Sequence, residues 1–479
     1  MKKILVSADR DEIRMALLAD ERLHSFEVER PSREHLVGNI YKGRVQNVLP
    51  GMQAAFLDIG GDKNAFLYIG DGLPHGAAGG VSEKAKIHVG QNLPVQIMKD
   101  AIGTKGPRAT LHISLPGRHL VLLPTAAYIA ISRRITDEEE RERLKSIGEE
   151  LVPQGMGVIL RTAAKGKSKE DLAADIGDLH RLWQSLLAKM SRVKAPALLY
   201  RDVDLLVRLM RDSFTEDVDE LIIDDRTLYA QAKDLAETLS PALADRIQYY
   251  DGKTPLFALC GVEEEIERLG DREVPLASGG SIIMDHTEAL TAIDVNTKGF
   301  VGDTNLSDTA YRTNLEAAKE ILKQLRLRDI GGIILVDFID MEKESQKEAL
   351  LSFLREEVKE ERTRTNIVDI TALGLVEITR KKSRQNLESI LYTSCPSCLG
   401  RGRVESPETM AIRICRDLRR IEARAHAANG YIVEVSPFVI DTLTSSEPLR
   451  ELRKELSIDV ELEAVGTMNI ESYSILQKS

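Results

Sequence analysis

The sequence predicts a mixed α/β and β protein made of several domains. Its 479 residues correspond to about three domains at the usual ~150 residues each. Hydrophobic residues make up 43% of the chain and charged residues 29%, which is the balance of a folded globular protein. Short β runs dominate one early segment, whereas strand and helix patterns alternate over the rest. These observations exclude a single small module, a disordered chain and a collagen.

Charge and cysteine content narrow the class further. The net charge is −11, yet residues 31–120 carry ten Lys or Arg against six Asp or Glu. A uniformly basic surface is therefore excluded, and a local basic site stays open. No run of ~18 apolar residues occurs, and four cysteines cannot form a dense disulfide framework. We expect a cytoplasmic protein that is neither exported nor membrane-spanning.

The first β-rich segment, residues 35–116, is interpreted as a small β-barrel of the OB type. Its short strands are broken by Gly, Asn and Pro and lack helical periodicity. Tyr41, Phe56 and Phe66 stand among basic residues, so they could stack bases beside a groove that binds phosphates. The alternative is that these rings fill the barrel. That alternative is favoured for Tyr41 and equally open for the two phenylalanines.

The barrel and the segment after it interrupt another domain. Residues 1–34 predict strands, and residues 209–270 alternate strand and helix, so we interpret them as two parts of one domain. Between them, residues 117–208 predict an α/β insertion with two helices. A Thr136–Glu139 capping box begins the first helix, and Ser168, with Asp171 three residues on, begins the second.

An arginine in this insertion could bind a phosphate. Arg161 and Thr162 follow a predicted strand, and Gly117 and Val121 lie in the same insertion. A guanidinium, a hydroxyl and backbone amides could converge there on a terminal phosphate. The alternative, an ordinary surface Arg-Thr pair, is the commoner case.

Residues 271–392 contain the most informative pattern. Asp294 ends one predicted strand and Asp337 ends another, with one amphipathic helix between the strands and a charged helix expected over about 342–363. A right-handed crossover makes such strands parallel neighbours, so the two carboxylates should lie at one edge of a sheet. That edge could bind Mg²⁺, and Asn296 could contact the water on the metal or the substrate. The alternative is that both aspartates cap loops or helices.

The segment at 393–403 contains Cys395 and Cys398 as a CxxC followed by glycine. Structural zinc needs four ligands, and no other cysteine or histidine accompanies this pair. The simplest solution is that two chains each supply one CxxC to a shared Zn²⁺. A redox dithiol is the competing interpretation.

Residues 404–479 alternate helix and strand and predict a small terminal domain.

Taken together, these motifs resemble the ribonuclease E/G family of bacterial endoribonucleases from about residue 3 to beyond 440. The stretches that carry the resemblance stand in family order: GNIYKGRVQNVLPGMQAAFLDIG, GTKGPR, ISRRI, GVILRTAA, GGSIIMDHTEALTAIDVNT, GGIILVDFIDM, GLVEITRKKSR and CPSCLGRG. The resemblance implies an RNase H-like domain (1–34 and 209–270) interrupted by an OB-type barrel (35–116) and a 5′-sensor region (117–208). A DNase I-like catalytic domain (271–392), a zinc link (393–403) and a small C-terminal domain (404–479) follow.

The resemblance also implies residue roles, which we carry over by position. Asp294 and Asp337 would bind the catalytic Mg²⁺ with Asn296 beside them, and Cys395 and Cys398 would bind the Zn²⁺ shared between chains. The 5′-phosphate pocket would be Gly117, Val121, Arg161 and Thr162, and the RNA contacts of the barrel would be Phe56, Phe66 and Lys105.

The activity implied is cleavage of single-stranded RNA, stimulated by a 5′-monophosphate, in rRNA and tRNA maturation and mRNA decay, by a homodimer or homotetramer. A non-catalytic RNA-binding protein and a DNA nuclease are the rival interpretations. Two departures from the family pattern matter. The sequence ends at Ser479 without the scaffold segment through which E-type enzymes recruit a degradosome, so the G type is closer in architecture. Ala372 stands where E-type enzymes carry a basic residue.

Overall fold

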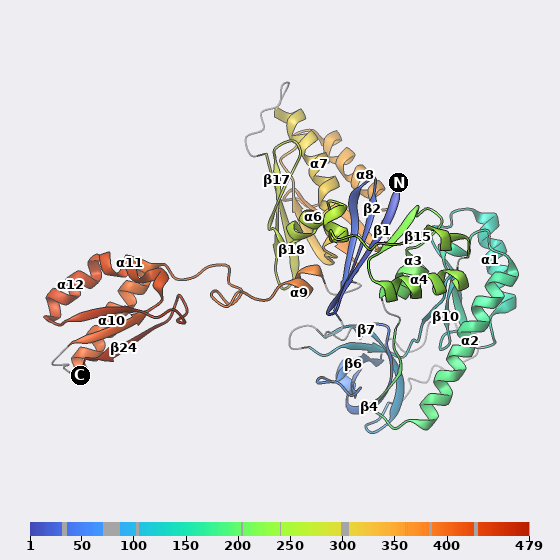
Figure 1. Cartoon of the computed structure of the whole chain (residues 1–479), viewed down its shortest axis with the longest axis horizontal. Coiled ribbons are helices and arrows are strands. Elements are labelled where there is room, and N and C mark those ends of the chain that lie inside the picture. Colours follow the sequence, from blue (N-terminus) through green and yellow to red (C-terminus); the bar gives the residue numbers. More distant parts are fainter. Residues whose placement is uncertain are drawn as a thin grey trace. The chain divides into compact units, whose positions relative to one another are not determined.

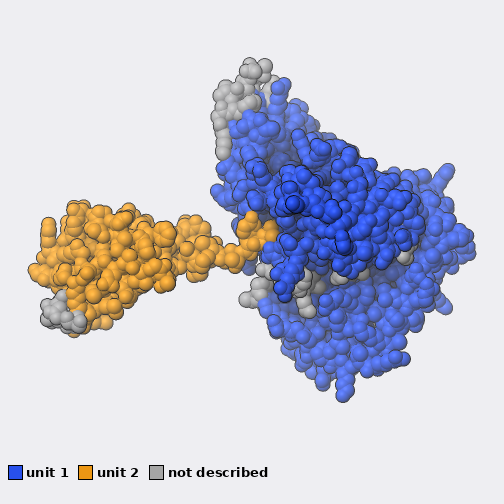
Figure 2. All heavy atoms as spheres, viewed as in Figure 1, with its two compact units in different colours: residues 1–390 blue, residues 391–479 orange. Residues whose placement is uncertain are grey.

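The computed structural model describes residues 1–30, 36–69, 87–101, 105–202, 205–239, 241–297, 306–359, 361, 363–382, 386–425 and 430–478. The chain divides into two compact units, residues 1–390 and 391–479, which Figure 2 shows in different colours. Their strands form five sheets within the described ranges. None of the described helices combines the length and the apolar composition that crossing a membrane requires.

The first sheet joins the start of the chain to a segment about two hundred residues later. Its order is β15-β14-β1-β2-β3, and β1 pairs in parallel with β14. Apolar residues of α3 and α4 pack on this sheet and form its core with Ile4, Val6 and Leu221. The elements of this region are β1 (Lys2–Asp9), β2 (Glu12–Ala19), β3 (Arg22–Glu29), α3 (Leu205–Asp212), β14 (Glu220–Ile223), α4 (Arg226–Leu239), β15 (Ile247–Tyr249), α5 (Leu256–Leu259) and α6 (Glu263–Glu267).

The predicted small barrel is confirmed as a closed five-stranded barrel, which is consistent with an OB-type domain. The strands follow the order β4-β5-β6-β8-β7, and β7 pairs again with β4 to close the ring. Alternate residues such as Val45, Leu57 and Val95 fill its interior. The elements are β4 (Ile40–Leu49), β5 (Ala54–Asp58), β6 (Ala65–Tyr68), β7 (Asn92–Lys99) and β8 (Arg108–Thr110), and β13 (Ala197–Tyr200) pairs with the outside of β4.

The insertion is a small sheet with two helices on one face. Leu120, Leu122 and Leu160 point toward the helices and pack on Trp183. The second helix begins at the predicted capping box of Ser168 and Asp171. The predicted Thr136 capping box is wrong. The N-cap is Asp137, whose carboxylate accepts hydrogen bonds from the backbone N–H groups of Glu139 and Glu140. The elements are β9 (Leu115–Pro116), β10 (Leu120–Leu123), β11 (Ile129–Ile131), α1 (Glu138–Leu151), β12 (Gly157–Leu160) and α2 (Lys169–Arg192).

The last part of unit 1, from β16 onward, is a six-stranded sheet with two helices on one face, visible as the yellow and orange part of Figure 1. Alternate residues such as Ile293 and Val336 pack on α7 and α8, which leaves the intervening residues on the other face. The charged helix expected over about 342–363 is α8, and it ends earlier, at Glu357. The elements are β16 (Glu273–Pro275), β17 (Ser281–His286), β18 (Leu290–Asn296), α7 (Leu306–Leu327), β19 (Gly332–Asp337), α8 (Glu344–Glu357), β20 (Thr365–Ile370), β21 (Leu375–Arg380) and α9 (Leu387–Leu391).

Unit 2 begins with the CxxC segment and continues as a three-stranded sheet of order β23-β22-β24. Its helices pack on the sheet through a core that includes Met410, Leu443 and Tyr431. The elements are α10 (Pro407–Ala425), β22 (Tyr431–Val435), α11 (Pro437–Ser445), α12 (Glu447–Leu456), β23 (Val460–Ala464) and β24 (Tyr473–Gln477).

Candidate active site

Asp294 and Asp337 are direct neighbours across two parallel strands. The register of β18 and β19 pairs Asp294 with Asp337, which confirms the predicted crossover and its shared edge. Residues on either side of each aspartate in the strand are buried, whereas both aspartates are exposed. Neighbouring strands lie about 4.8 Å apart, so the two carboxylates share one open face of the sheet. We refer to these two residues as the carboxylate pair.

Asn296 holds one member of the carboxylate pair in place. It lies two residues beyond Asp294 on the same face of β18, and its Nδ2 donates a hydrogen bond of 2.8 Å to Asp294 Oδ2. Neither aspartate forms an ion pair with any residue that the structure describes. The negative charge of the pair is therefore not compensated by the described protein.

The donor atoms of this site fit a hard divalent cation. Both side chains are carboxylates, exposed and side by side. Over the described ranges, no group of three or more His, Cys, Asp or Glu side chains gathers at metal-binding distances. Mg²⁺ suits such a site, because it is usually bound by one or two carboxylates and completes its shell with water and phosphate oxygens.

Phe56 and Phe66 lie on the outside of the barrel. They face each other across the antiparallel β5–β6 pair, with ring centroids 5.7 Å apart and an interplanar angle of 71°. Both are half-buried, while Tyr41 is buried in the barrel core. The barrel-filling alternative therefore holds for Tyr41 and fails for the two phenylalanines.

Lys105 is exposed at the edge of the strand that carries Phe66. The Phe66 backbone N–H donates to the Pro107 carbonyl at 2.7 Å, which brings the segment of Lys105 beside β6. Gly106 permits this approach, because a Cβ there would lie 2.2 Å from the Asn64 carbonyl oxygen. Lys105 thus lies in the segment that leads into β8, next to the strand that carries Phe66.

The insertion brings Arg161 beside Gly117. Arg161 Nη1 donates to the Gly117 carbonyl at 3.0 Å, and the Arg161 backbone N–H donates to the His119 carbonyl at 2.8 Å. Thr162 follows, with its Oγ1 3.0 Å from Ser132 Oγ. Val121 lies on β10, the strand next to β12. Gly117, Val121, Arg161 and Thr162 are called the Arg161 cluster below.

Asp212 is the residue at this cluster that sequence reasoning missed. Its Oδ1 accepts a hydrogen bond of 2.6 Å from Arg161 Nη1, and Arg211 donates to both of its oxygens. Burial opposes ionisation of Asp212, but the hydrogen bonds and charges of Arg211 and Arg161 outweigh it and hold the pKa of Asp212 below its usual value. No local sequence signal pairs residues 51 positions apart.

The contacts of Arg161 leave one edge of its guanidinium for a ligand. The described contacts use Nη1 only, so Nε and Nη2 have no hydrogen-bond partner among the described residues. These two groups form a donor fork that matches two phosphate oxygens. Gly117 must lack a side chain here, because a Cβ would lie 2.5 Å from the Asp175 carboxylate, which accepts the His119 backbone N–H.

Cys395 and Cys398 lie in a tight turn of unit 2. The Leu399 backbone N–H donates to the Cys395 carbonyl, and Leu399, Gly400 and Gly402 all have positive φ. Backbone N–H groups of Cys398 and Ser397 lower the pKa of the Cys395 thiol, which favours the thiolate that metals bind. Burial raises the pKa of the Cys260 and Cys415 thiols. Of the four cysteines, only Cys395 and Cys398 share one turn.

The chain is similar to known proteins over almost its whole length. A model of the ribonuclease E/G family matches residues 114–383. Ribonuclease G of Escherichia coli strain K12 is 39% identical over 485 residues, covering 99% of each chain. The chain belongs to the ribonuclease E/G family. Ribonuclease G of Haemophilus influenzae is also 39% identical, over 93% of this chain and 92% of that protein.

Ribonuclease E of Escherichia coli is a longer relative. It is 37% identical over 438 residues, which cover 90% of this chain and 41% of that protein. The match to ribonuclease E/G proteins thus spans both units described above, including the carboxylate pair, the barrel, the Arg161 cluster and the CxxC turn.

Proposed function

We propose that this member of the ribonuclease E/G family is a Mg²⁺-dependent endoribonuclease that hydrolyses phosphodiester bonds in single-stranded RNA. The observation that carries the proposal is the pairing of Asp294 with Asp337 on an exposed sheet face, where neither carboxylate forms an ion pair with a described residue. Family membership supports ribonuclease activity, because the matched relatives are named ribonucleases.

Three residues would have distinct roles in the hydrolysis. Asp294 and Asp337 would bind Mg²⁺, which when bound supplies positive charge to a phosphodiester oxygen and activates water. Asn296 orients the Asp294 carboxylate through its amide and can donate its second N–H to the scissile region. The product ends expected are a 5′-phosphate and a 3′-hydroxyl.

RNA would be held by the outer surface of the barrel. Phe56 and Phe66 present ring faces and edges to solvent, and base stacking on aromatic rings contributes about 1 to 3 kcal/mol per base. Lys105 would bind the phosphate backbone beside them. Because stacking tolerates any base, these contacts would bind the strand and leave the choice of cleavage site to other residues.

The Arg161 cluster would bind a 5′-monophosphate and thereby stimulate cleavage. The open Nε–Nη2 edge of Arg161 offers a bidentate contact, and the Thr162 hydroxyl offers one more. Binding one end of the RNA raises the effective concentration of the rest of the strand at the carboxylate pair.

For the architecture, we propose the domain boundaries and names that the resemblance implies. These are an interrupted RNase H-like domain, a 5′-sensor region, a DNase I-like catalytic domain, a zinc link and a small C-terminal domain. The CxxC of each chain would supply half of a Zn²⁺ site between two chains, which would make the protein a homodimer or a homotetramer. Action in the cytoplasm on rRNA and tRNA precursors and mRNA completes the proposal.

The test is incubation of the purified protein with 5′-labelled single-stranded RNA, with and without Mg²⁺, beside a single-stranded DNA of the same sequence. We expect internal cuts in RNA only when Mg²⁺ is present. Cleavage of DNA at an equal rate would favour the DNA nuclease. Tight RNA binding without any cut in Mg²⁺ or Mn²⁺ would favour the non-catalytic RNA-binding protein.

A further inference from the structure

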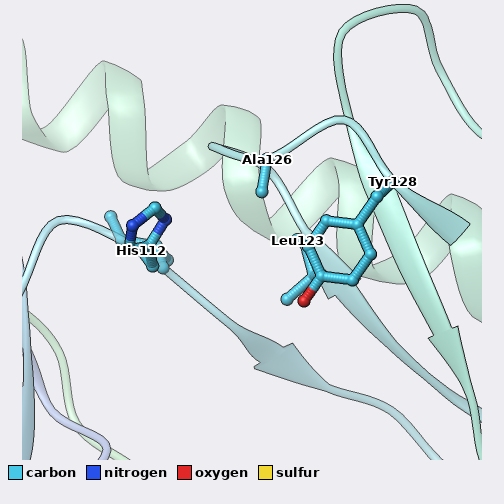
Figure 3. Close-up of a pocket in the computed structure, with 5 residues that line it drawn as sticks. His112, Leu123, Ala126 and Tyr128 are labelled. Atoms are coloured by element: carbon cyan, nitrogen blue, oxygen red, sulfur yellow. The ribbon is translucent and has the colours of Figure 1, made fainter. Parts of the chain in front are cut away.

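A pocket of about 210 Å³ lies where the segment after the barrel meets the insertion, and none of the residues discussed so far line it. Its lining comes from His112, Ile113, Leu123, Ala126 and Tyr128. Figure 3 shows the His112 and Tyr128 rings projecting from two separate segments, with Ala126 between them. Tyr128 is 43% exposed and its hydroxyl makes no hydrogen bond with any described residue. The pocket therefore combines an apolar floor with two aromatic walls.

This pocket opens on the same sheet face as the Arg161 cluster. Leu123 pairs with Gly157 and Val121 pairs with Ile159 in the β10–β12 register, and side chains two residues apart on a strand share a face. Arg161 follows Ile159 by two residues and so continues the same row. From Arg161 to Gly157 the distance along the strand is roughly 13 Å at ~3.3 Å per residue. Ile159 and Val121, itself a member of the Arg161 cluster, lie between Arg161 and the pocket.

The position of Tyr128 is fixed by its backbone. The Val158 N–H donates to the Tyr128 carbonyl at 2.9 Å. Gly157 allows this contact, since a Cβ there would lie 2.3 Å from the Tyr128 carbonyl oxygen and 2.5 Å from that of Ala126. On the opposite wall, the Ile113 N–H donates to Thr125 Oγ1 at 3.0 Å, which ties the two segments together. The pocket is thus formed before any ligand arrives.

We propose that this pocket binds a nucleobase near the 5′ end of the RNA whose terminal phosphate lies at Arg161. The inference rests on the proposed function, because it takes the RNA and its direction from there. Tyr and His rings are side chains on which proteins stack unpaired bases. The pocket is smaller than the 300–1,000 Å³ of drug-sized ligand sites and suits one planar group. Neither ring needs to read base identity, so the site would measure the presence of an unstacked base close to the end.

The test uses the full-length protein without added Mg²⁺ and a 5′-monophosphorylated single-stranded RNA. The fluorescent base 2-aminopurine replaces each of the first four bases in turn, and its quenching reports stacking. Wild-type protein should quench one position most strongly. Tyr128→Ala should abolish that quenching and weaken binding about 5- to 10-fold, near the low end of the stacking range because the ring is partly exposed. Tyr128→Phe should behave as wild type.

Controls separate the pocket from other effects. Leu187→Ala, which truncates an exposed apolar side chain on α2, should change neither signal. An RNA that lacks the base at the quenched position should bind wild type and Tyr128→Ala equally. Unchanged quenching in Tyr128→Ala, or equal weakening with the abasic RNA, would overturn the inference.

The outcome also distinguishes this inference from the proposed function. Tyr128-dependent quenching with a protein that never cuts RNA would support the pocket and reject the nuclease. Equal quenching with 5′-hydroxyl RNA would support the pocket and reject its coupling to a terminal phosphate. Failure of the wild type to bind single-stranded RNA at all would reject both.

Discussion

The carboxylate pair and the Arg161 cluster both place charged side chains on an exposed sheet face, yet they manage that charge in opposite ways. Asp294 and Asp337 adjoin each other, and neither forms an ion pair with a described residue. Arg161 already has a counter-ion, because its Nη1 donates a hydrogen bond to the Asp212 carboxylate. The first site therefore lacks a positive partner that must come from outside the chain. The second already contains a counter-ion, which Arg161 shares with Arg211, and keeps one donor edge of Arg161 for a ligand.

This difference predicts that substitutions in the carboxylate pair reduce cleavage more than substitutions at the other sites. Asp294→Asn or Asp337→Asn should slow cleavage of RNA by about 10³-fold or more, because loss of a metal ligand removes several kcal/mol of transition-state stabilisation. RNA binding should be unchanged, as measured by filter binding or fluorescence anisotropy. Asp285→Asn is the matched control on the neighbouring strand, where the carboxylate pairs with exposed Arg272. Wild-type turnover by either site variant in Mg²⁺ would refute the assignment.

The CxxC turn offers a third case, because Cys395 and Cys398 stand only three residues apart and would, on our proposal, supply half of a zinc site. We expect about one zinc per two chains by metal analysis. The double variant Cys395→Ser, Cys398→Ser should lose the zinc and raise the dimer dissociation constant at least about 100-fold in analytical ultracentrifugation, since structural zinc contributes many kcal/mol. Cys260→Ser should retain both. One full zinc per chain would show that the site is complete within a single chain.

At the Arg161 cluster we expect a selective loss. Arg161→Ala should slow cleavage of 5′-monophosphorylated RNA by about 10- to 100-fold, because each charge-assisted hydrogen bond contributes roughly 1.5 to 3 kcal/mol. Cleavage of 5′-hydroxyl RNA should stay the same. Arg161→Lys should also lose most of the preference, because an ammonium lacks the donor fork. Arg143→Ala removes an exposed arginine of α1 and serves as the control. Equal slowing on both substrates would instead assign Arg161 to folding or to general RNA binding.

The smallest effect concerns the counter-ion of Arg161. Asp212→Asn should lower the free energy of unfolding of this region by about 1 kcal/mol near neutral pH, a modest value because the pair is about 30% exposed. The pKa of Asp212 is lower in the folded protein, so its contribution is present above the unfolded pKa of about 3.9 and disappears as the pH falls through the folded value.

Trp183, the single tryptophan of the chain, lies in the core of the insertion and reports its unfolding. Urea midpoints followed by its fluorescence should differ between wild type and Asp212→Asn by a constant amount from pH 8 to 5 and converge below about pH 4. Asp178→Asn, at an exposed carboxylate of α2, should match wild type throughout. A difference that grows on acidification would contradict the ion-pair explanation.

The same contrast explains what the sequence could predict. The strands of Asp294 and Asp337 are joined by one helix, so strand patterns and the crossover rule place them together. The closed barrel and the Ser168 capping box follow from local patterns too. The predicted start of α1 is wrong by one residue, because threonine and aspartate both cap helices and Asp137 is the residue that does so here.

Contacts between distant segments could not be predicted in this way. Asp212, at the end of α3, pairs with Arg161, which follows β12. Tyr128 and His112 come from separate segments and line one pocket. Neither pair has a periodicity or spacing that marks it. Such contacts depend on how whole helices and strands pack together. A local stretch of one sequence carries no information about that packing.

The parallel pairing of β1 with β14 has a consequence for how the chain is made. Residues 30–219 separate β3 from β14, and a ribosome adding about 5 to 20 residues per second needs about 10 to 40 s to synthesise them. During that interval the first three strands have emerged while one edge of β1 still lacks its neighbour. The barrel, complete by residue 110, can close while the earlier sheet waits. The first strands of the protein to be made thus belong to a sheet that is finished only after the barrel has closed and the sheet of the insertion is complete.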